Sequence, residues 1–332
     1  MDRRAVIAVM LVALAWIPGA NVSPQLNLCG PWYHCWPPLL VFLLEGDQPG
    51  PQRESPSTPL REHPEEPTSS SHTTFGYGSH NGPGVWHLTY PECGGSRQSP
   101  VDLDARAVLP MEALQPLLWS NYWVPPSNMS LANNGHTVML SASWEPPLLQ
   151  PAISGGPLAG DYVFEQLHFH WGPEDSVGSE HTVNNLSFPM EMHAVHYKRD
   201  YGSFQEALRH RDGVAVVAFL FVAGERDNPA LGRLVTPMQA LKRRAGSGSV
   251  VERPFPLALL KPRRDAEYVT YSGSLTTPPC SEVVTWIIGT APLRVSRGQL
   301  SVFRDLSSSG SMDEFNYRPV QPLNHRLMFL FR

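Results

Sequence analysis

Two histidines separated by one residue, His168 and His170, lie in a stretch of alternating polar and apolar residues. In a β-strand, residues i and i+2 project from the same face about 7 Å apart, so two imidazoles at this spacing can bind one metal ion. A third histidine, His193, lies in another alternating stretch. Three neutral nitrogen ligands leave the fourth tetrahedral position open for water, which is typical of a catalytic zinc site. The sequence therefore predicts a Zn²⁺ cofactor.

Polar side chains accompany two of these histidines. Gln166 precedes His168 by two residues, and Glu191 precedes His193 by two residues. Each can orient an imidazole by hydrogen bonding to its outward nitrogen. The alternative is a set of ordinary strand histidines, which is the better interpretation of an isolated His-x-His pair because histidine is often partly buried without a metal. The third histidine and the two polar neighbours favour the metal site.

The stretches that carry the histidines are predicted to be strands of a sheet. Residues 162–171 alternate, which places Phe164 on the same face as the histidine pair. Residues 190–197 alternate in the same way. Residues 214–222 are almost uniformly apolar, which predicts a strand that is buried on both faces.

The rest of the chain favours a mainly β fold with a few helices, in a single domain. From Phe75 onward, short apolar or alternating runs are bounded by Gly, Pro and Asn. Asn228 and Pro229 are typical of a helix start, and apolar residues follow at helical spacing. Residues 296–306 are a second, weaker helix candidate.

The first 20 residues have the organisation of a secretory signal peptide. Arg3 and Arg4 precede an apolar run over residues 5–17, and small residues follow up to Ala20. This run is shorter than the roughly 20 residues that a membrane-spanning helix needs, and no later segment reaches that length. We therefore expect residues 1–20 to direct secretion of an extracellular protein without a transmembrane segment.

Residues 21–74 are predicted to form a disordered or extended N-terminal extension. Nine prolines and many Ser, Glu and Thr residues fall between residues 31 and 73, with little periodic apolar pattern. Cys29 and Cys35 can close a small loop in this extension or pair with another chain, and the sequence favours neither arrangement.

The overall charge argues against two classes of partner. The formal net charge is −5, and no block of Lys and Arg interrupts the sequence. Proteins that bind nucleic acid or anionic membrane surfaces usually carry a basic patch. We therefore expect no nucleic-acid partner and no electrostatic membrane binding, and the sequence specifies no oligomeric state.

Several longer motifs resemble the alpha-class carbonic anhydrases. They are Gln166 to Gly172, Gly178 to Val183, Glu191 to His193 and Gly273 to Cys280, in the order and at the spacing of that family. Shorter matches extend the resemblance over residues 75–326, which we expect to be the catalytic domain, followed by a short C-terminal tail over residues 327–332. The resemblance implies a large twisted, mostly antiparallel central sheet and the reversible hydration of carbon dioxide to bicarbonate and a proton.

The resemblance also assigns roles to residues outside the metal site. Thr276 would accept a hydrogen bond from the zinc-bound hydroxide and donate its own proton to Glu180, which orients the hydroxide toward the substrate. Thr277 would contact bicarbonate, and His181 would support the zinc ligands. Without the zinc ligands, a threonine pair before Pro278 would more simply begin a loop.

An apolar wall is expected beside the metal, because carbon dioxide has no charge and must be held by shape and dry surface. Each wall residue taken alone would be interpreted as ordinary core. The residues that match the family's wall are Val195, Val216, Leu275, Val284 and Trp286.

His136 occupies the position of the family's proton shuttle, after Asn133, Asn134 and Gly135. A histidine titrates near neutral pH, which suits the transfer of a proton to solvent. The alternative is an exposed histidine in a turn that the Asn-Gly pair forms.

Cys93 and Cys280 resemble the pair that forms a disulfide in secreted and membrane-bound family members. Asn128 and Asn185 each begin an Asn-x-Ser glycosylation motif, and Asn21 begins another. The resemblance therefore implies a secreted glycoprotein with one disulfide in its catalytic domain.

Two other functions are compatible with this type of domain. Family members that lack a zinc ligand act as binding or adhesion modules, but this chain keeps the three histidines, Thr276 and Glu180. Ester hydrolysis as the main reaction is less favoured because no acyl-recognition motif is evident.

Overall fold

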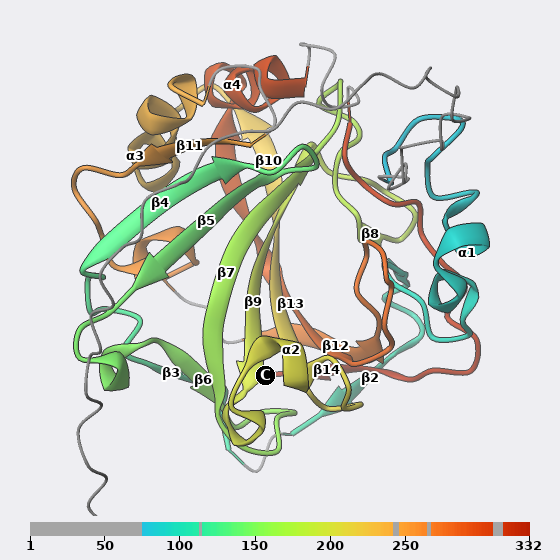
Figure 1. The fold of residues 1–332 in the computed structure, drawn as a ribbon. Helices are drawn as coiled ribbons and strands as arrows, with labels where there is room; N and C mark the ends of the chain where they lie inside the picture. The colour runs from blue at the N-terminus through green and yellow to red at the C-terminus, as the bar shows by residue number, and fades with distance from the viewer. Residues whose placement is uncertain (1–74, 113–114, 242–245, 264–266, 308–314) are drawn as a thin grey trace, which may run out of the picture. The chain divides into compact units, whose positions relative to one another are not determined.

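Figure 1 shows a computed structural model of the chain, which describes residues 75–112, 115–241, 246–263, 267–307 and 315–332. They belong to one compact unit, Thr68–Arg332. The predicted signal peptide and extension, including Cys29 and Cys35, lie outside the described residues. Within the described ranges, no helix has both the length and the apolar character that crossing a membrane requires.

A large, twisted and mostly antiparallel sheet organises the domain, as predicted (Figure 1). Its strands are β2 (Val108–Met111), β3 (Leu118–Ser120), β4 (Asn128–Asn133), β5 (Val138–Ser143), β6 (Ala152–Ser154), β7 (Tyr162–Trp171), β9 (Met190–Lys198), β10 (Val214–Gly224), β11 (Ser247–Val250), β12 (Tyr268–Gly273), β13 (Val284–Ser296) and β14 (Met328–Phe331). They follow the order β11-β4-β5-β7-β9-β10-β13-β12-β14-β2, and β3 joins through β6 to β7. The described pairs β10–β13 and β14–β2 are parallel. A separate parallel pair joins β1 (Asp102–Leu103) to β8 (Thr182–Val183).

Short helices flank the sheet. They are α1 (Trp86–Thr89), α2 (Phe204–Ala207), α3 (Pro229–Gln239) and α4 (Arg297–Ser307), with 3-10 turns at Pro91–Gly94, Pro147–Leu149, Arg199–Tyr201 and Leu257–Leu260. The predicted start of α3 is confirmed, because the Asn228 side chain accepts hydrogen bonds from the N–H groups of Ala230 and Leu231. α3 and α4 pack together and contribute Leu234 and Phe303 to the main core.

Strand β10 is buried on both faces, as predicted. It lies between β9 and β13 in the sheet. Ala215 and Val217 pack in the main core on one side, whereas Val214 and Val216 pack in a second apolar cluster on the other side. Because neither face meets solvent, this strand needs no polar residues.

Phe164 lies on the opposite face of β7 from the one predicted. The register between β7 and β9 shifts between Phe164 and Gln166, so β7 contains one extra residue at this point. Phe164 packs against Trp144 and His196 in the main core. The period-2 alternation in the sequence does not reveal such a bulge.

The last residues form a strand instead of the expected tail. β14 pairs antiparallel with β12 and parallel with β2. Met328 and Phe331 are buried, and the Phe331 ring stacks on Tyr268. The sheet therefore continues beyond residue 326, because apolar residues of β14 fill the space between β12 and β2.

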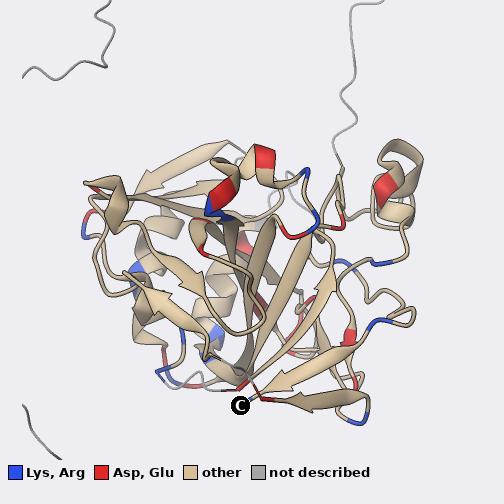
Figure 2. Ribbon diagram, turned by 90° about the horizontal axis from the view of Figure 1, so that it is seen from below, with Lys and Arg blue, Asp and Glu red and all other residues tan. Residues whose placement is uncertain are grey.

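Charged residues of both signs are distributed over the loops and helices of the described domain (Figure 2). One cluster joins the turn after β7 to α4. Asp175 accepts hydrogen bonds from Arg297 and Arg304, and Arg304 also donates to the carbonyl of Gly172. These contacts fix the turn that follows His170.

Candidate active site

Three imidazoles from two neighbouring strands converge on one point. His168 and His170 come from β7, and His193 comes from β9 directly opposite His168. The ring centroids are 4.6 to 5.1 Å apart. One nitrogen from each ring lies within 4.8 Å of the others. The spacing predicted from the sequence therefore brings all three candidate ligands together.

The outward nitrogen of each imidazole faces a hydrogen-bond acceptor. His168 Nδ1 donates to Gln166 Oε1 at 2.9 Å, and His193 Nε2 donates to Glu191 Oε1 at 2.7 Å. His170 Nδ1 donates to the main-chain carbonyl of Asn316 at 2.7 Å. An N–H on the outward nitrogen of a neutral ring leaves a lone pair on the inward nitrogen, which is the form that binds a metal.

The inward nitrogens fit a cation. His170 Nε2 is buried and has no hydrogen-bond partner among the described residues. Burial lowers the pKa of His170 to about 3, with the neighbouring His193 adding to the effect. Burial likewise lowers the pKa of His168 well below its ordinary value, followed by repulsion from the other two imidazoles. The three rings are thus neutral at physiological pH, as ligands for Zn²⁺ must be.

Glu191 accepts hydrogen bonds from the candidate ligand His193 and from a fourth histidine, His181. Besides His193, its carboxylate accepts hydrogen bonds from His181 Nδ1 at 2.7 Å and from the backbone N–H groups of Glu180 and His181 at 2.8 Å. Burial alone would raise the pKa of Glu191, but the electrostatic interactions and hydrogen bonds with His181 and His193 hold it below the ordinary value. Glu191 is therefore ionised and acts as a fixed acceptor for both rings.

Glu180 lies beside the inward nitrogens. Its Oε2 is 3.4 Å from His170 Nε2 and 3.9 Å from His193 Nδ1, and its Oε1 accepts the backbone N–H of Arg318 at 2.9 Å. Burial and then the charge of Glu191 raise its pKa well above the ordinary value, whereas the Thr276 hydroxyl opposes the rise. The structure thus places Glu180 and Thr276 next to each other at the metal site.

A chain of hydrogen bonds connects His181 to the segment that carries Thr276. His181 Nε2 lies 2.8 Å from the Tyr271 hydroxyl, which donates to Ser99 Oγ at 2.8 Å. Ser99 and Ser274 then exchange two bonds, each backbone N–H donating to the other residue's hydroxyl. The metal-supporting side chains and the Thr276 segment are therefore held in one network.

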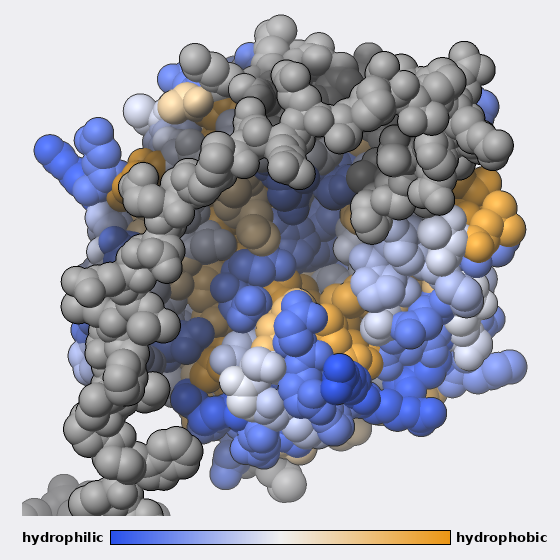
Figure 3. Space-filling model, viewed as in Figure 1, coloured by the Kyte–Doolittle hydropathy of each residue, from blue (hydrophilic) through white to orange (hydrophobic). Residues whose placement is uncertain are grey.

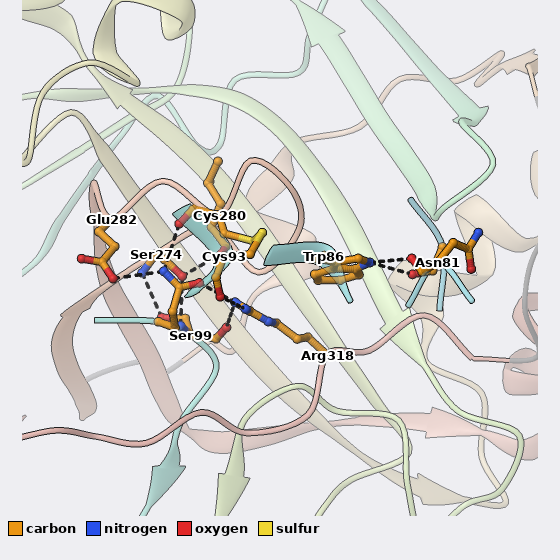
Figure 4. Close-up of a disulfide and its surroundings, with 11 residues drawn as sticks. Asn81, Trp86, Cys93, Ser99, Ser274, Cys280, Glu282 and Arg318 are labelled. Atoms are coloured by element: carbon orange, nitrogen blue, oxygen red, sulfur yellow. Dashed lines mark hydrogen bonds between the residues drawn. A yellow bond between two sulfur atoms is a disulfide. The ribbon is translucent and has the colours of Figure 1, made fainter. Parts of the chain in front are cut away.

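A disulfide joins Cys93 to Cys280 beside this network, which confirms the pairing that the resemblance implied (Figure 4). Gln98 donates to the carbonyl of Cys280, and the buried guanidinium of Arg318 donates to the carbonyl of Cys93. Glu282 in turn accepts from Gln98. The end of the Thr276 segment is thus anchored by one covalent bond and several hydrogen bonds.

A pocket of about 250 Å³ opens beside the imidazoles. Apolar surface adjoins polar surface near the middle of the face seen in Figure 3, over the region of α2. The predicted residues in the lining are Gln166, His168, His193, Val195, Val216, Leu275, Thr276, Thr277 and Trp286. Val284 is not among the lining residues of this pocket, but it packs in the same apolar cluster as Val195, Val216 and Trp286, so its place in the wall stays a prediction.

Phe204 and Leu208 complete the apolar side of the pocket, together with Pro278 and Pro279. The sequence pattern does not predict Phe204 or Leu208 as pocket residues. Their i, i+4 spacing places them on one face of a helical turn, and Ser203 caps that turn by accepting from the N–H of Glu206. This spacing is a signal for a helix, but it does not indicate which surface the helix faces.

His136 lies in the bend between β4 and β5. Its ring stacks on Phe75, with the ring centroids 3.9 Å apart and an interplanar angle of 11°. His136 is not among the residues that line the pocket. It is half-buried, and its role as proton shuttle stays a prediction.

Comparison with known proteins identifies the class of enzyme that this fold and site define. A profile described as eukaryotic-type carbonic anhydrase matches residues 81–331. Carbonic anhydrase 7 of Mus musculus is 38% identical over 265 residues, which cover 78% of this chain and 97% of that protein. Carbonic anhydrase 3 of Homo sapiens is 37% identical over 265 residues, with 76% and 96% covered. The chain therefore belongs to the eukaryotic-type, or alpha-class, carbonic anhydrases.

Proposed function

We propose that this enzyme catalyses the reversible hydration of carbon dioxide to bicarbonate and a proton, with Zn²⁺ held by His168, His170 and His193. One observation carries the proposal: the three imidazoles present neutral nitrogens to one point at the edge of a partly apolar pocket. Bound zinc would supply the acidification of a water molecule that the reaction needs, a case for which carbonic anhydrase is itself the standard example.

Thr276 orients the attacking oxygen in this proposal. Thr276 is buried, and its hydroxyl lies beside Glu180. A hydroxyl that donates to a carboxylate must accept from its other neighbour, which fixes the direction of the lone pair aimed at the substrate. Thr277 also lines the pocket, and in this proposal it contacts bicarbonate.

The apolar lining holds the substrate. Carbon dioxide carries no charge, so it is placed by shape and by surface that excludes water. Val195, Val216 and Leu275 supply such surface beside the imidazoles, with Trp286 at the base. His136 then transfers the proton to buffer through water.

Zinc content and hydration activity of the purified protein test the proposal together. We expect about one zinc per chain and rapid carbon dioxide hydration. The matched variant His193→Ala should lose both. A wild-type protein with neither metal nor activity would instead support the binding-module alternative.

We also propose that residues 1–20 export the protein and that residues 21–74 remain as an N-terminal extension. The Cys93–Cys280 disulfide supports an oxidising compartment. Asn128 and Asn185 are exposed, as glycan acceptors must be. The intact mass of the product from a secreting host cell tests cleavage and glycosylation, and an unprocessed intracellular chain would contradict both.

A further inference from the structure

Asn316 connects three parts of the site that lie far apart in the sequence. Its main-chain carbonyl accepts from His170, and its Oδ1 accepts the backbone N–H of Trp171 at 2.7 Å. Its Nδ2 donates to the carbonyls of His136 at 2.9 Å and Phe169 at 3.0 Å. Asn316 is 1% exposed, so water does not compete for these bonds.

The bonds from the Asn316 side chain lie where the backbone pairing between β5 and β7 has ended. The last described pair on this side of the ladder is Met139 with His168. Beyond it, Thr137 Oγ1 bonds to the N–H and the carbonyl of Phe169. The Asn316 amide adds the connection to the His136 carbonyl. Side chains thus replace the backbone ladder as the link between β7 and the His136 turn.

The His136 turn is a compact unit. Asn134 Oδ1 accepts the N–H groups of both His136 and Thr137, each at 2.9 Å, and the Asn134 N–H donates to the Thr137 carbonyl. These bonds close the turn on itself through its own side chain and backbone. A bond to the His136 carbonyl therefore fixes the position from which the His136 ring extends.

We propose that the side-chain amide of Asn316 is a positioning residue for proton transfer: it fixes the His136 turn to the strand that carries His170. The inference rests on the proposed function, because it requires His136 to be the proton shuttle. Proton transfer is sensitive to donor placement, so displacement of the turn slows it without changing the pocket in which carbon dioxide reacts.

Asn316→Asp tests this role. Aspartate keeps an oxygen that accepts from Trp171 but replaces the amide donor that faces His136 and Phe169. In weak buffer, kcat includes the proton-transfer step, and we expect it to fall about tenfold. This loss is smaller than the ~10²-fold or more that a positioned proton-transfer group supplies, because the group is displaced and not removed. We expect zinc content and kcat/KM to be retained. Asn121→Asp is the matched control, because it removes an exposed amide bond to the Leu148 carbonyl and should change neither constant.

A double variant separates positioning from a general structural effect. In a His136→Ala background, Asn316→Asp should cause no further loss of kcat, because both changes act on the same step. Added imidazole should restore kcat in Asn316→Asp, in His136→Ala and in the double variant. If Asn316→Asp does not fold, Asn316→Ser serves instead, because its hydroxyl lies on a shorter side chain than the amide that reaches His136.

Three results would overturn the positioning role while leaving the proposed function in place. They are an unchanged kcat in Asn316→Asp, an equal loss of kcat and kcat/KM, and an additive loss in the double variant. A wild-type enzyme without hydration activity would reject the proposed function itself. Unchanged kcat in His136→Ala would reject the shuttle and, with it, the positioning role.

Discussion

His193 Nδ1 lies 3.3 Å from His168 Nε2, and the outward nitrogens of the buried His193 ring and the half-buried His168 ring are hydrogen-bonded to fixed acceptors. Two lone pairs at this distance repel each other in a medium of low dielectric. A cation placed between them converts the repulsion into attraction. The two strands are thus arranged for a metal, and the carboxylate of Glu191 is part of that arrangement.

Glu191→Gln should weaken zinc binding about 10- to 100-fold, the usual cost of losing the outer partner of a metal-bound histidine. The amide no longer offers a negative charge to the two imidazole N–H groups. It also replaces one acceptor oxygen by an NH2 donor, although both carboxylate oxygens of the wild type accept from N–H groups. Competition with a chelator measures the affinity. Glu225→Gln, which alters an exposed ion pair with Arg297, is the matched control. Equal affinities for both variants would contradict the assigned role.

Thr276→Val should lower kcat/KM for carbon dioxide hydration by about 10²-fold, comparable to the loss of one preorganised polar group in other active sites. Valine keeps the shape of the side chain but cannot link Glu180 to the attacking oxygen. Thr276→Ser keeps the hydroxyl and should retain most of the activity. Stopped-flow hydration assays measure the difference, and a serine variant as slow as the valine variant would indicate a packing role instead.

His196 makes the folded state sensitive to acid. It is buried, its Nε2 lies 2.5 Å from the Tyr122 hydroxyl, and burial lowers its pKa to about 3. Between pH 6.5 and 3 the unfolded chain binds a proton at this ring and the folded chain does not. As the pH is lowered through this window, the free energy of unfolding therefore decreases, by up to about 1.4 kcal/mol per pH unit from this group.

His196→Gln removes that contribution, so its free energy of unfolding should depend less steeply on pH. Urea denaturation of both proteins between pH 4 and 6.5, at one fixed zinc concentration, measures the two slopes. Identical slopes would show that His196 does not resist protonation in the folded state.

Removing the Cys93–Cys280 disulfide should destabilise the domain by about 2–5 kcal/mol, because the bond closes a long loop in the unfolded chain. The two cysteines are 187 residues apart. A Cys93→Ser, Cys280→Ser double variant should therefore unfold at lower denaturant concentration. Reduction of the wild type should reproduce the loss, and reduction of the double variant should have no effect. A stable reduced wild type would place the stabilisation in the surrounding hydrogen bonds.

The candidate metal ligands are predictable from the sequence because their arrangement depends on a local property of a strand. In a strand, residues i and i+2 project from the same face. The same rule finds Gln166 and Glu191. It does not find Asn316, which lies 146 residues from His170 and supports it through a main-chain carbonyl. Every residue carries such a carbonyl, so no side-chain pattern marks the one that is used.

Two positions show what the residue type leaves undecided. Phe164 lies on the face opposite to the predicted one because one extra residue enters β7, and Val284 packs in the second apolar cluster without lining the pocket. In both cases the residue type fits either environment, because an apolar side chain packs equally well in a core and in the wall of a substrate pocket. Tertiary packing alone decides between them.

The position of β14 in the sequence and in the sheet determines when the large sheet can be completed during synthesis. β2 is the first strand of the large sheet along the described sequence, and it joins that sheet through β14, which is the last. Until residues 328–331 have emerged from the ribosome, β2 has no strand to pair with, and one edge of β12 stays open. The sheet is therefore completed only after residues 328–331 emerge, and a nascent chain stalled before them presents two unpaired strand edges to chaperones.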